Sequence, residues 1–241
     1  MVQAKRAEEE TGVLNGCRFP DRRSAGRLLA SRLGDYARRG GVVVLGLPRG
    51  GVPVAFEVAD ALDAPLDVFV VRKLGVPFQP ELAMGAIASG GVRVLNDDIL
   101  AMAGVTPEMV ARAVSVEERE LARREHLYRG DRPTFALTGK IVILVDDGLA
   151  TGSTMRAAVE AVRRLGPARV IVAVPVGAPE TCQLLAREAD DVICLQMPVP
   201  FSAVGLWYED FLQTTDDDVR ELLEQAASRV AIPPPSLRAG T

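Results

Sequence analysis

The chain has 241 residues, of which 48% are hydrophobic and 25% are charged, and its formal net charge is −4. This is enough for one large α/β domain with a sizeable core. The negative balance argues against nucleic acid as a partner, because nucleic-acid binding usually requires a basic face. The first sixteen residues lack the apolar core of a signal peptide, and no run approaches the ~18 apolar residues of a membrane span. We therefore expect a cytoplasmic protein with no membrane partner.

Three cysteines, Cys17, Cys182 and Cys194, are scattered along the chain. They form no CxxC pair, and no Cys/His spacing typical of a zinc site is present. We interpret them as reduced thiols that pack as small hydrophobic side chains.

Residues 1–16 are polar and charged, and we expect a flexible N-terminal arm there. A helix follows, with Asp21 or Ser24 as its cap, and it ends near Gly40. Four large residues recur at helical spacing and are expected to face a core, namely Leu28, Leu29, Leu33 and Tyr36.

Two short apolar runs, 42–46 and 65–71, predict strands that are buried on both faces of a sheet. A turn at 47–51 and a helix at 52–62 separate them. This order predicts an α/β fold, with a doubly wound, mainly parallel sheet flanked by helices, because crossovers between parallel strands place helices over the sheet.

The pattern changes after residue 71. Residues 72–81 contain one Gly, two Pro and few periodic positions, so a loop is expected. The next two short strands, 85–89 and 92–95, would be antiparallel and joined by a tight turn at Gly90-Gly91.

A long charged helix is predicted over 107–128, with Thr106 as its cap and Pro107 at its first position. Its charges are interpreted as a solvated face. The only histidine, His126, lies on this helix and is interpreted as a solvated residue.

The remaining chain alternates strands and helices again. The expected elements are strand 141–145, helix 154–165, strand 168–174, helix 179–188, strand 191–195 and helix 216–227. Residues 197–211 are irregular and rich in aromatic side chains. The Pro-rich tail at 231–241 should be disordered, so 17–230 is expected to form a single domain.

One stretch organises the chemistry. The buried strand 141–145 ends in Asp146 and Asp147, and a small hydroxyl-rich loop leads into the next helix. A helix N-terminus favours an anion through its free N–H groups and its dipole. On its own an acidic pair after a strand is usually a turn with a helix cap. The flanking pattern instead favours a phosphorylated sugar, with acids for its hydroxyls and N–H groups for its phosphate.

A second unusual loop, 47–51, follows strand 42–46. Ligands of open α/β sheets bind outside the carboxyl ends of strands, so the two loops share one crevice if their strands are neighbours. Residues 47–51 could also be an ordinary turn. They lack the Lys-Ser/Thr ending of a P-loop and the GxGxxG spacing, which excludes those two nucleotide-binding interpretations.

Residues 145–154, Val-Asp-Asp-Gly-Leu-Ala-Thr-Gly-Ser-Thr, resemble the phosphoribosyl pyrophosphate motif of the type I phosphoribosyltransferases. Leu47-Pro-Arg-Gly-Gly51 resembles the pyrophosphate loop of that family, and Arg72-Lys73 resembles the start of its mobile catalytic loop. The resemblance covers about 17–212 and is nearest to bacterial phosphoribosyltransferase-like proteins whose acceptor is unassigned. Those proteins share the arrangements Arg-Lys-Leu-Gly-x-Pro and Trp-Tyr-Glu-Asp-Phe.

The resemblance implies the type I phosphoribosyltransferase fold, with a small hood at about 196–212 and a mobile β-hairpin loop. It implies transfer of ribose 5-phosphate from phosphoribosyl pyrophosphate to a small-molecule acceptor, with Mg²⁺ as cofactor. The expected catalytic residues are Arg72, Lys73, Asp146 and Asp147. The two aspartates would also contact Mg²⁺, mostly through substrate and water. The expected ribose 5-phosphate contacts are Asp146, Asp147, Gly148, Ala150, Thr151, Gly152, Ser153 and Thr154, and the pyrophosphate contacts are Pro48, Arg49, Gly50 and Gly51.

The acceptor is less defined. Family members that act on 6-oxopurines carry an acid where this chain has Ala150, which argues against hypoxanthine or guanine. Glu81, Phe201 and Trp207 are candidate acceptor contacts, although the aromatic residues could equally form a packed cap.

A non-catalytic regulator that binds phosphoribosyl pyrophosphate is the alternative function. Family members are often dimers, and the sequence leaves a homodimer open.

Overall fold

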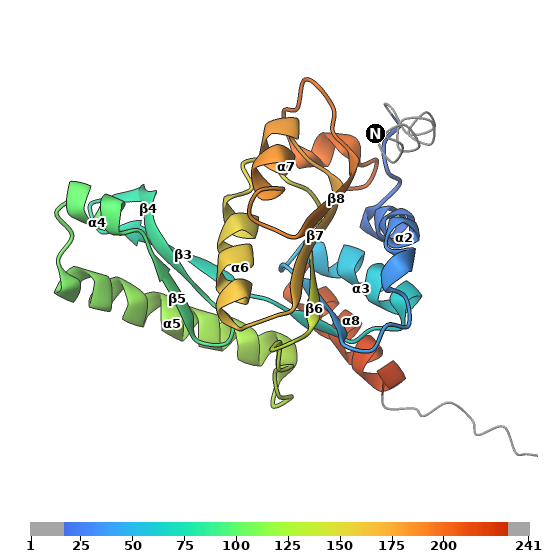
Figure 1. Cartoon of the computed structure of the whole chain (residues 1–241), viewed down its shortest axis with the longest axis horizontal. Coiled ribbons are helices and arrows are strands. Elements are labelled where there is room, and N and C mark those ends of the chain that lie inside the picture. Colours follow the sequence, from blue (N-terminus) through green and yellow to red (C-terminus); the bar gives the residue numbers. More distant parts are fainter. Residues whose placement is uncertain (1–16, 231–241) are drawn as a thin grey trace, which may run out of the picture.

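The computed structural model describes residues 17–230 (Figure 1), so the expected N-terminal arm and C-terminal tail lie outside the described residues. Its centre is a five-stranded parallel sheet in the order β2-β1-β6-β7-β8. The strands are β1 (Val42–Gly46), β2 (Leu66–Val68), β6 (Ile141–Val145), β7 (Arg169–Val176) and β8 (Asp191–Gln196). The predicted doubly wound, mainly parallel sheet is therefore confirmed.

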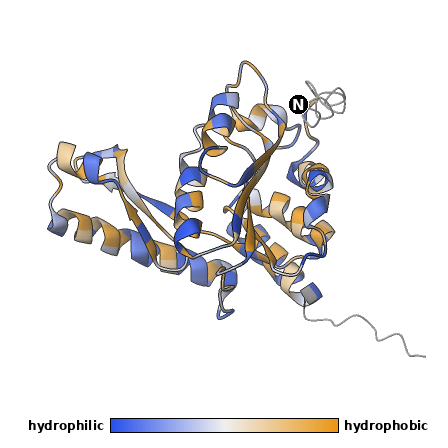
Figure 2. Cartoon of the chain, in the orientation of Figure 1, coloured by the Kyte–Doolittle hydropathy of each residue, from blue (hydrophilic) through white to orange (hydrophobic). Residues whose placement is uncertain are grey.

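Helices cover both faces of this sheet. One face packs against α2 (Arg22–Arg32), α3 (Gly51–Leu62) and α8 (Asp216–Val230), and the other against α6 (Ser153–Arg164) and α7 (Pro179–Leu185). Successive residues of the strands belong to different cores: Val44 lies in the first and Leu45 in the second. Because side chains alternate across a strand, both faces must be apolar, which explains the continuous hydrophobic runs. Figure 2 shows these central strands as the most hydrophobic part of the ribbon.

A projection, residues 71–129, extends from the central sheet (Figure 1). It consists of the antiparallel strands β3 (Val71–Val76), β4 (Gln79–Ala88) and β5 (Val92–Leu95), followed by α4 (Asp97–Met102) and α5 (Pro107–Arg129). The predicted turn at Gly90-Gly91 is confirmed, with φ of 81° and 72° at the two glycines. The Thr106 cap and Pro107 at the first turn of α5 are confirmed as well.

The predicted loop at 72–81 is wrong, because these residues form most of the hairpin β3–β4. Leu74 and Val76 are fully buried, whereas Lys73 is exposed to solvent, which is the alternation of a strand. Gly75 sits at a break in register, where a Cβ would lie 2.6 Å from the Pro80 carbonyl oxygen. The glycine that suggested a loop therefore permits a close approach of the two strands.

Smaller differences concern element ends. The first helix ends at Arg32 and is followed by the short η2 (Gly34–Tyr36), and Leu28 is 40% exposed instead of facing the core. The predicted strand 65–71 is divided between β2 and β3. The short α4 was not predicted, and η3 (Val204–Trp207) lies within the aromatic segment. Among residues 17–230, no helix combines the length and the apolar character that crossing a bilayer requires.

Candidate functional site

The two unusual loops lie side by side. Strands β1 and β6 are hydrogen-bonded neighbours with Gly46 opposite Val145, and the Leu47 amide donates to the Val145 carbonyl at 2.9 Å. We call residues 47–51 the Arg-Gly-Gly loop and residues 146–154 the acidic loop. Both leave the carboxyl edge of the sheet, where parallel-sheet proteins bind ligands. The strands are therefore neighbours, as the shared site requires, and the two loops begin side by side.

The glycines of the Arg-Gly-Gly loop make room for the two carboxylates. A Cβ on Gly50 would lie 2.0 Å from Oδ2 of Asp147, and a Cβ on Gly51 would lie 3.0 Å from Oδ1 of Asp146. Any larger side chain would displace the acidic loop. These contacts are a structural reason for both glycines, in addition to the close approach of a pyrophosphate that the sequence suggested.

The two carboxylates have different environments. Burial and the neighbouring Asp147 charge raise the pKa of Asp146 well above its ordinary value, and Oδ1 of Asp146 accepts the Asp147 backbone N–H at 2.8 Å. Burial also raises the pKa of Asp147, but the Arg22 guanidinium opposes that rise. Nε of Arg22 donates to Oδ2 of Asp147 at 2.8 Å. Asp147 is thus half of an ion pair, whereas no cationic side chain within 17–230 pairs with Asp146.

Arg22 is a site residue that the sequence did not indicate, and the contact of Tyr208 with the acidic loop was not predicted either. Arg22 also donates to the Leu212 carbonyl at 2.7 Å and lies 3.8 Å from the centre of the Phe211 ring. The Tyr208 hydroxyl donates to the Asp147 carbonyl at 2.6 Å. Both residues join the acidic loop to the C-terminal segment. They lie 125 and 61 residues from Asp147 in the chain, so no local spacing could have identified them.

The end of the acidic loop forms an open helix N-terminus. Gly152 adopts φ of 69°, and α6 begins at Ser153. The Thr151 and Ser153 hydroxyls lie 2.8 Å apart and are exposed, as is Thr154. The Thr181 hydroxyl stabilises the loop by donating to the Ala150 carbonyl at 2.7 Å. Free N–H groups and hydroxyls in this arrangement can bind a phosphate-sized anion.

Arg49, on the Arg-Gly-Gly loop, approaches the start of α8. Its NH1 lies 3.9 Å from Oδ1 of Asp216, the first residue of α8. The preceding Pro48 is half-buried, and the Pro48–Arg49 peptide bond is cis. The Arg49 side chain is partly exposed, so its guanidinium has partial access to solvent.

The structure separates the predicted residues of the projection. Arg72 pairs with Glu117 on α5, with NH2 and Oε2 2.6 Å apart, so its guanidinium is turned away from the acidic loop. Lys73 lines a cavity of about 850 Å³ between the projection and α6, and Ser153 and Thr154 line the same cavity. Glu81 is exposed on β4 and does not line this cavity. Of the three predicted residues on the projection, Lys73 is therefore the one that lines a cavity together with residues of the acidic loop.

The hood, residues 196–212, packs mainly on itself and on the start of the described chain. Phe201 and Trp207 are half-buried beside a small core that contains Phe19 and Tyr208. Two hood residues approach the acidic loop: Tyr208 donates to the Asp147 carbonyl, and the Cγ1 of Val204 would lie 2.5 Å from a Cβ on Gly148. The hood therefore reaches the acidic loop through Tyr208 and Val204, and an acceptor role for Phe201 and Trp207 stays a prediction.

Comparison with known proteins agrees with the family resemblance of the sequence motifs. The family described as "Phosphoribosyl transferase domain" matches residues 22–209. Two Mycobacterium tuberculosis proteins, provisionally named phosphoribosyl transferases, are each 52% identical over 212 residues. Each alignment covers 86% of this chain, and the chain spans 47% of the length of those relatives.

A bifunctional protein PyrR of Chloroflexus aurantiacus is 31% identical over 137 residues, which are 52% of this chain and 65% of that protein. The crystal structure of TT1426 from Thermus thermophilus is 46% identical, with a TM-score of 0.78 over 86% of this chain and 98% of that one. Together with the acidic loop and the parallel sheet, the match over 22–209 shows that this chain belongs to the phosphoribosyltransferase family.

Proposed function

We propose that this chain is an Mg²⁺-dependent phosphoribosyltransferase. It transfers ribose 5-phosphate from phosphoribosyl pyrophosphate to a base or another nucleophile and releases pyrophosphate. One observation carries this proposal: the acidic loop, with its open helix N-terminus, contacts the Arg-Gly-Gly loop directly at one edge of the sheet. A sugar with phosphate groups at two separate positions matches this arrangement of carboxylates, helix N–H groups and an arginine loop.

The donor contacts follow from the chemistry of each loop. In this proposal Asp146 and Asp147 bind the ribose hydroxyls, and residues 150–154 bind the 5-phosphate through backbone N–H groups and hydroxyls. Arg49 and the amides of Gly50 and Gly51 bind the pyrophosphate. The exposure of Thr151, Ser153 and Thr154 supports this assignment, because a phosphate must reach them from solvent.

The site fits a magnesium ion that arrives with the donor. Among residues 17–230, no group of three or more His, Cys, Asp or Glu side chains could hold a metal ion alone. Mg²⁺ usually takes one or two carboxylates and completes its shell with substrate phosphates and water, and Asp146 and Asp147 provide that pair. When bound, the ion would supply positive charge beside the leaving pyrophosphate.

The protein's own residues contribute binding and charge stabilisation. The bond between C1 of the ribose and pyrophosphate breaks, its electron pair leaves with the pyrophosphate, and the nucleophile forms the new bond to C1. Arg49 and the Gly50 and Gly51 amides would stabilise the negative charge that develops on the leaving group. Lys73, across the cavity from α6, would add a second cation when the projection approaches the donor.

The acceptor site lacks an acid next to the 5-phosphate, since Ala150 occupies that position. The side chain that the hood brings to Gly148 is the aliphatic Val204. Recognition of the acceptor therefore depends on other groups, with Glu81, Phe201 and Trp207 as the candidates.

Calorimetry with phosphoribosyl pyrophosphate and Mg²⁺ tests the donor site. The wild type should bind, Asp146→Asn should bind much more weakly, and Asp217→Asn, a charge-matched surface control, should bind like the wild type. Absence of binding by the wild type would contradict the proposal. A panel of bases is then screened for pyrophosphate release. Tight donor binding without release from any acceptor would favour the non-catalytic regulator.

A further inference from the structure

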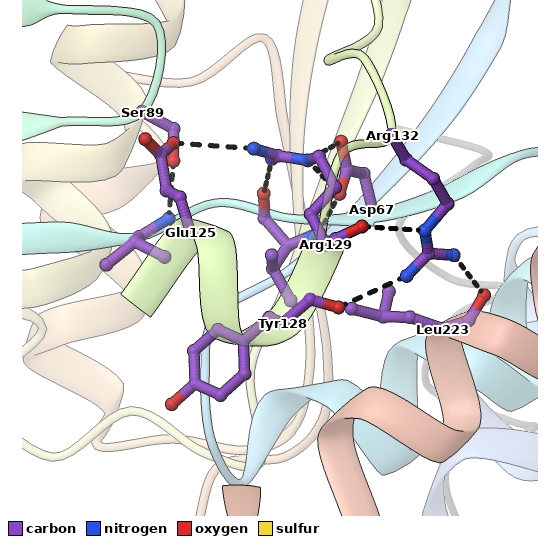
Figure 3. A network of polar contacts seen from close by, with 9 residues as sticks. Asp67, Ser89, Glu125, Tyr128, Arg129, Arg132 and Leu223 are labelled. Carbon is purple, nitrogen blue, oxygen red and sulfur yellow. Dashed lines mark hydrogen bonds and ion pairs between the residues drawn. The ribbon is translucent and has the colours of Figure 1, made fainter. Parts of the chain in front are cut away.

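A buried polar network holds the C-terminal end of α5 against the central sheet (Figure 3). Nε of Arg129 lies 3.1 Å from both carboxylate oxygens of Asp67, and its NH2 donates to the Val68 carbonyl at 3.2 Å. Arg132 donates to the carbonyls of Tyr128 and Leu223 at 3.1 and 2.9 Å. The network joins α5 to β2 and α8, so the backbone of Tyr128 is fixed relative to both elements.

The Tyr128 side chain leaves this network in another direction. Figure 3 shows its ring turned away from the Arg129–Asp67 pair. The ring is buried, and the hydroxyl donates to Oδ1 of Asp216 at 2.7 Å. Burial and this hydrogen bond raise the pKa of Tyr128 to about 12, so the hydroxyl keeps its proton at neutral pH. Tyr128 is therefore a fixed hydrogen-bond donor to Asp216.

Asp216 faces a second partner, Arg49 of the Arg-Gly-Gly loop. Their closest atoms are 3.9 Å apart, beyond hydrogen-bond distance, although the side chains are 37% and 43% exposed and not confined by burial. An arginine and a carboxylate this close usually form a direct, often bidentate, pair. The oxygen that approaches Arg49 is Oδ1, the same atom that accepts the Tyr128 hydroxyl.

We propose that Tyr128 is a positioning residue for the donor site: its hydroxyl holds the Asp216 carboxylate back from Arg49 and leaves that guanidinium free to bind an anionic ligand. The inference rests on the proposed function, which gives Arg49 the donor pyrophosphate as its ligand. Without the hydroxyl, Asp216 closes on Arg49 and competes with the pyrophosphate. Tyr128 acts through Asp216 and does not touch the donor itself.

This role predicts an effect of Tyr128 that depends on Asp216. Tyr128→Phe keeps the buried ring and removes the hydroxyl, and it should raise the Kd for Mg²⁺–phosphoribosyl pyrophosphate about threefold to fivefold, the effect of one partly exposed ion pair. In the double variant Tyr128→Phe/Asp216→Asn the competitor is gone, and the Kd should return to the wild-type value or below it. Asp216→Asn alone should bind the donor at least as tightly as the wild type.

Asp217→Asn supplies the matched control. Asp217 lies on the same turn of α8, its side chain is 82% exposed, and it pairs with Arg220. The Asp217→Asn substitution removes one negative charge, as Asp216→Asn does, but at a residue that pairs with neither Arg49 nor Tyr128. Tyr128→Phe/Asp217→Asn should therefore stay as weak as Tyr128→Phe. Thermal melting of each variant checks that the fold is retained.

Three outcomes would overturn the proposal. Tyr128→Phe could bind the donor like the wild type. Its weaker binding could persist in the double variant with Asp216→Asn, which would make Tyr128 purely structural. Asp216→Asn alone could weaken binding more than Asp217→Asn, which would make Asp216 an aid to Arg49 instead of a competitor. Failure of the wild type to bind is a different result, because it would remove the proposed function itself.

Discussion

The carboxyl edge of the central sheet and the projection contribute to the candidate site in different ways. At the edge, Gly50 and Gly51 lie directly against Asp147 and Asp146. On the projection, Arg72 is paired with Glu117 and Lys73 only borders the cavity shared with α6. The edge is preorganised because adjacent parallel strands place their following loops together. In the proposed mechanism the projection must approach the donor before its residues act, because Arg72 is held by a contact within the projection.

The largest effect should come from Asp146→Asn. The Kd for Mg²⁺–phosphoribosyl pyrophosphate should rise about 100-fold, because a charged hydrogen-bond acceptor at the centre of the edge is lost. Calorimetry measures this change. An unchanged Kd would show that the donor binds away from the acidic loop.

The same variant should be more stable than the wild type, by about 1 kcal/mol at neutral pH. The folded-state pKa of Asp146 is raised by burial and by Asp147. The stability that depends on protonation of Asp146 is therefore fully present below the pKa of this group in the unfolded state. It is lost as the pH rises through the pKa of the group in the folded state. Urea unfolding should show the advantage of the variant at neutral pH and its decrease as pH falls toward the ordinary aspartate value of 3.8.

Asp147→Asn should have the opposite effect on stability, a loss of about 2 kcal/mol, because it leaves the Arg22 guanidinium without its counter-charge. The side chains of Arg22 and Asp147 are only 11% and 16% exposed. Urea unfolding of Asp147→Asn, Arg22→Met and the double variant should give a clear interaction energy. Arg23→Met is the control, since Arg23 is on the same helix but pairs with Glu57. Additive losses would contradict a specific Arg22–Asp147 pair.

Gly50→Ala tests the packing between the two loops. The added methyl would overlap Oδ2 of Asp147, so we expect a loss of about 1–2 kcal/mol in stability together with weaker donor binding. Gly40→Ala, where a Cβ meets nothing within 4 Å, should stay within about 0.5 kcal/mol of the wild type. Equal behaviour of the two variants in unfolding experiments would refute the close contact.

The effect expected on the projection is on turnover. Lys73→Ala should lower turnover about tenfold and leave the donor Kd nearly unchanged, because Lys73 acts only when the projection approaches the donor. Arg93→Ala is the control, since Arg93 lies on β5 and pairs with Glu118. Turnover is followed by pyrophosphate release once an acceptor is found. Equal losses in turnover and donor affinity would make Lys73 a simple binding residue.

Much of the fold followed from local patterns. The bounds of β1 and β6 agree with the predicted strands, because a run of buried β-branched residues has one favourable structure inside a parallel sheet. The acidic loop and the Arg-Gly-Gly loop were identified for the same reason, since the order of strand, loop and helix is local. The family resemblance implied a hairpin, but the local pattern at 72–81 predicted a loop, because Gly75 and Pro80 are tolerated only at a register break that the pairing of two strands creates.

Local sequence patterns specify the residue types that the site requires: two carboxylates after a buried strand, a hydroxyl-rich helix start and a loop with Arg49 and two glycines. The contacts that these groups make are set by the tertiary structure. It pairs Asp147, and not Asp146, with Arg22, and it places Asp216 next to both Arg49 and Tyr128. Such contacts join residues from distant parts of the chain. Their geometry depends on how the helices pack over the sheet, which no short window of sequence encodes.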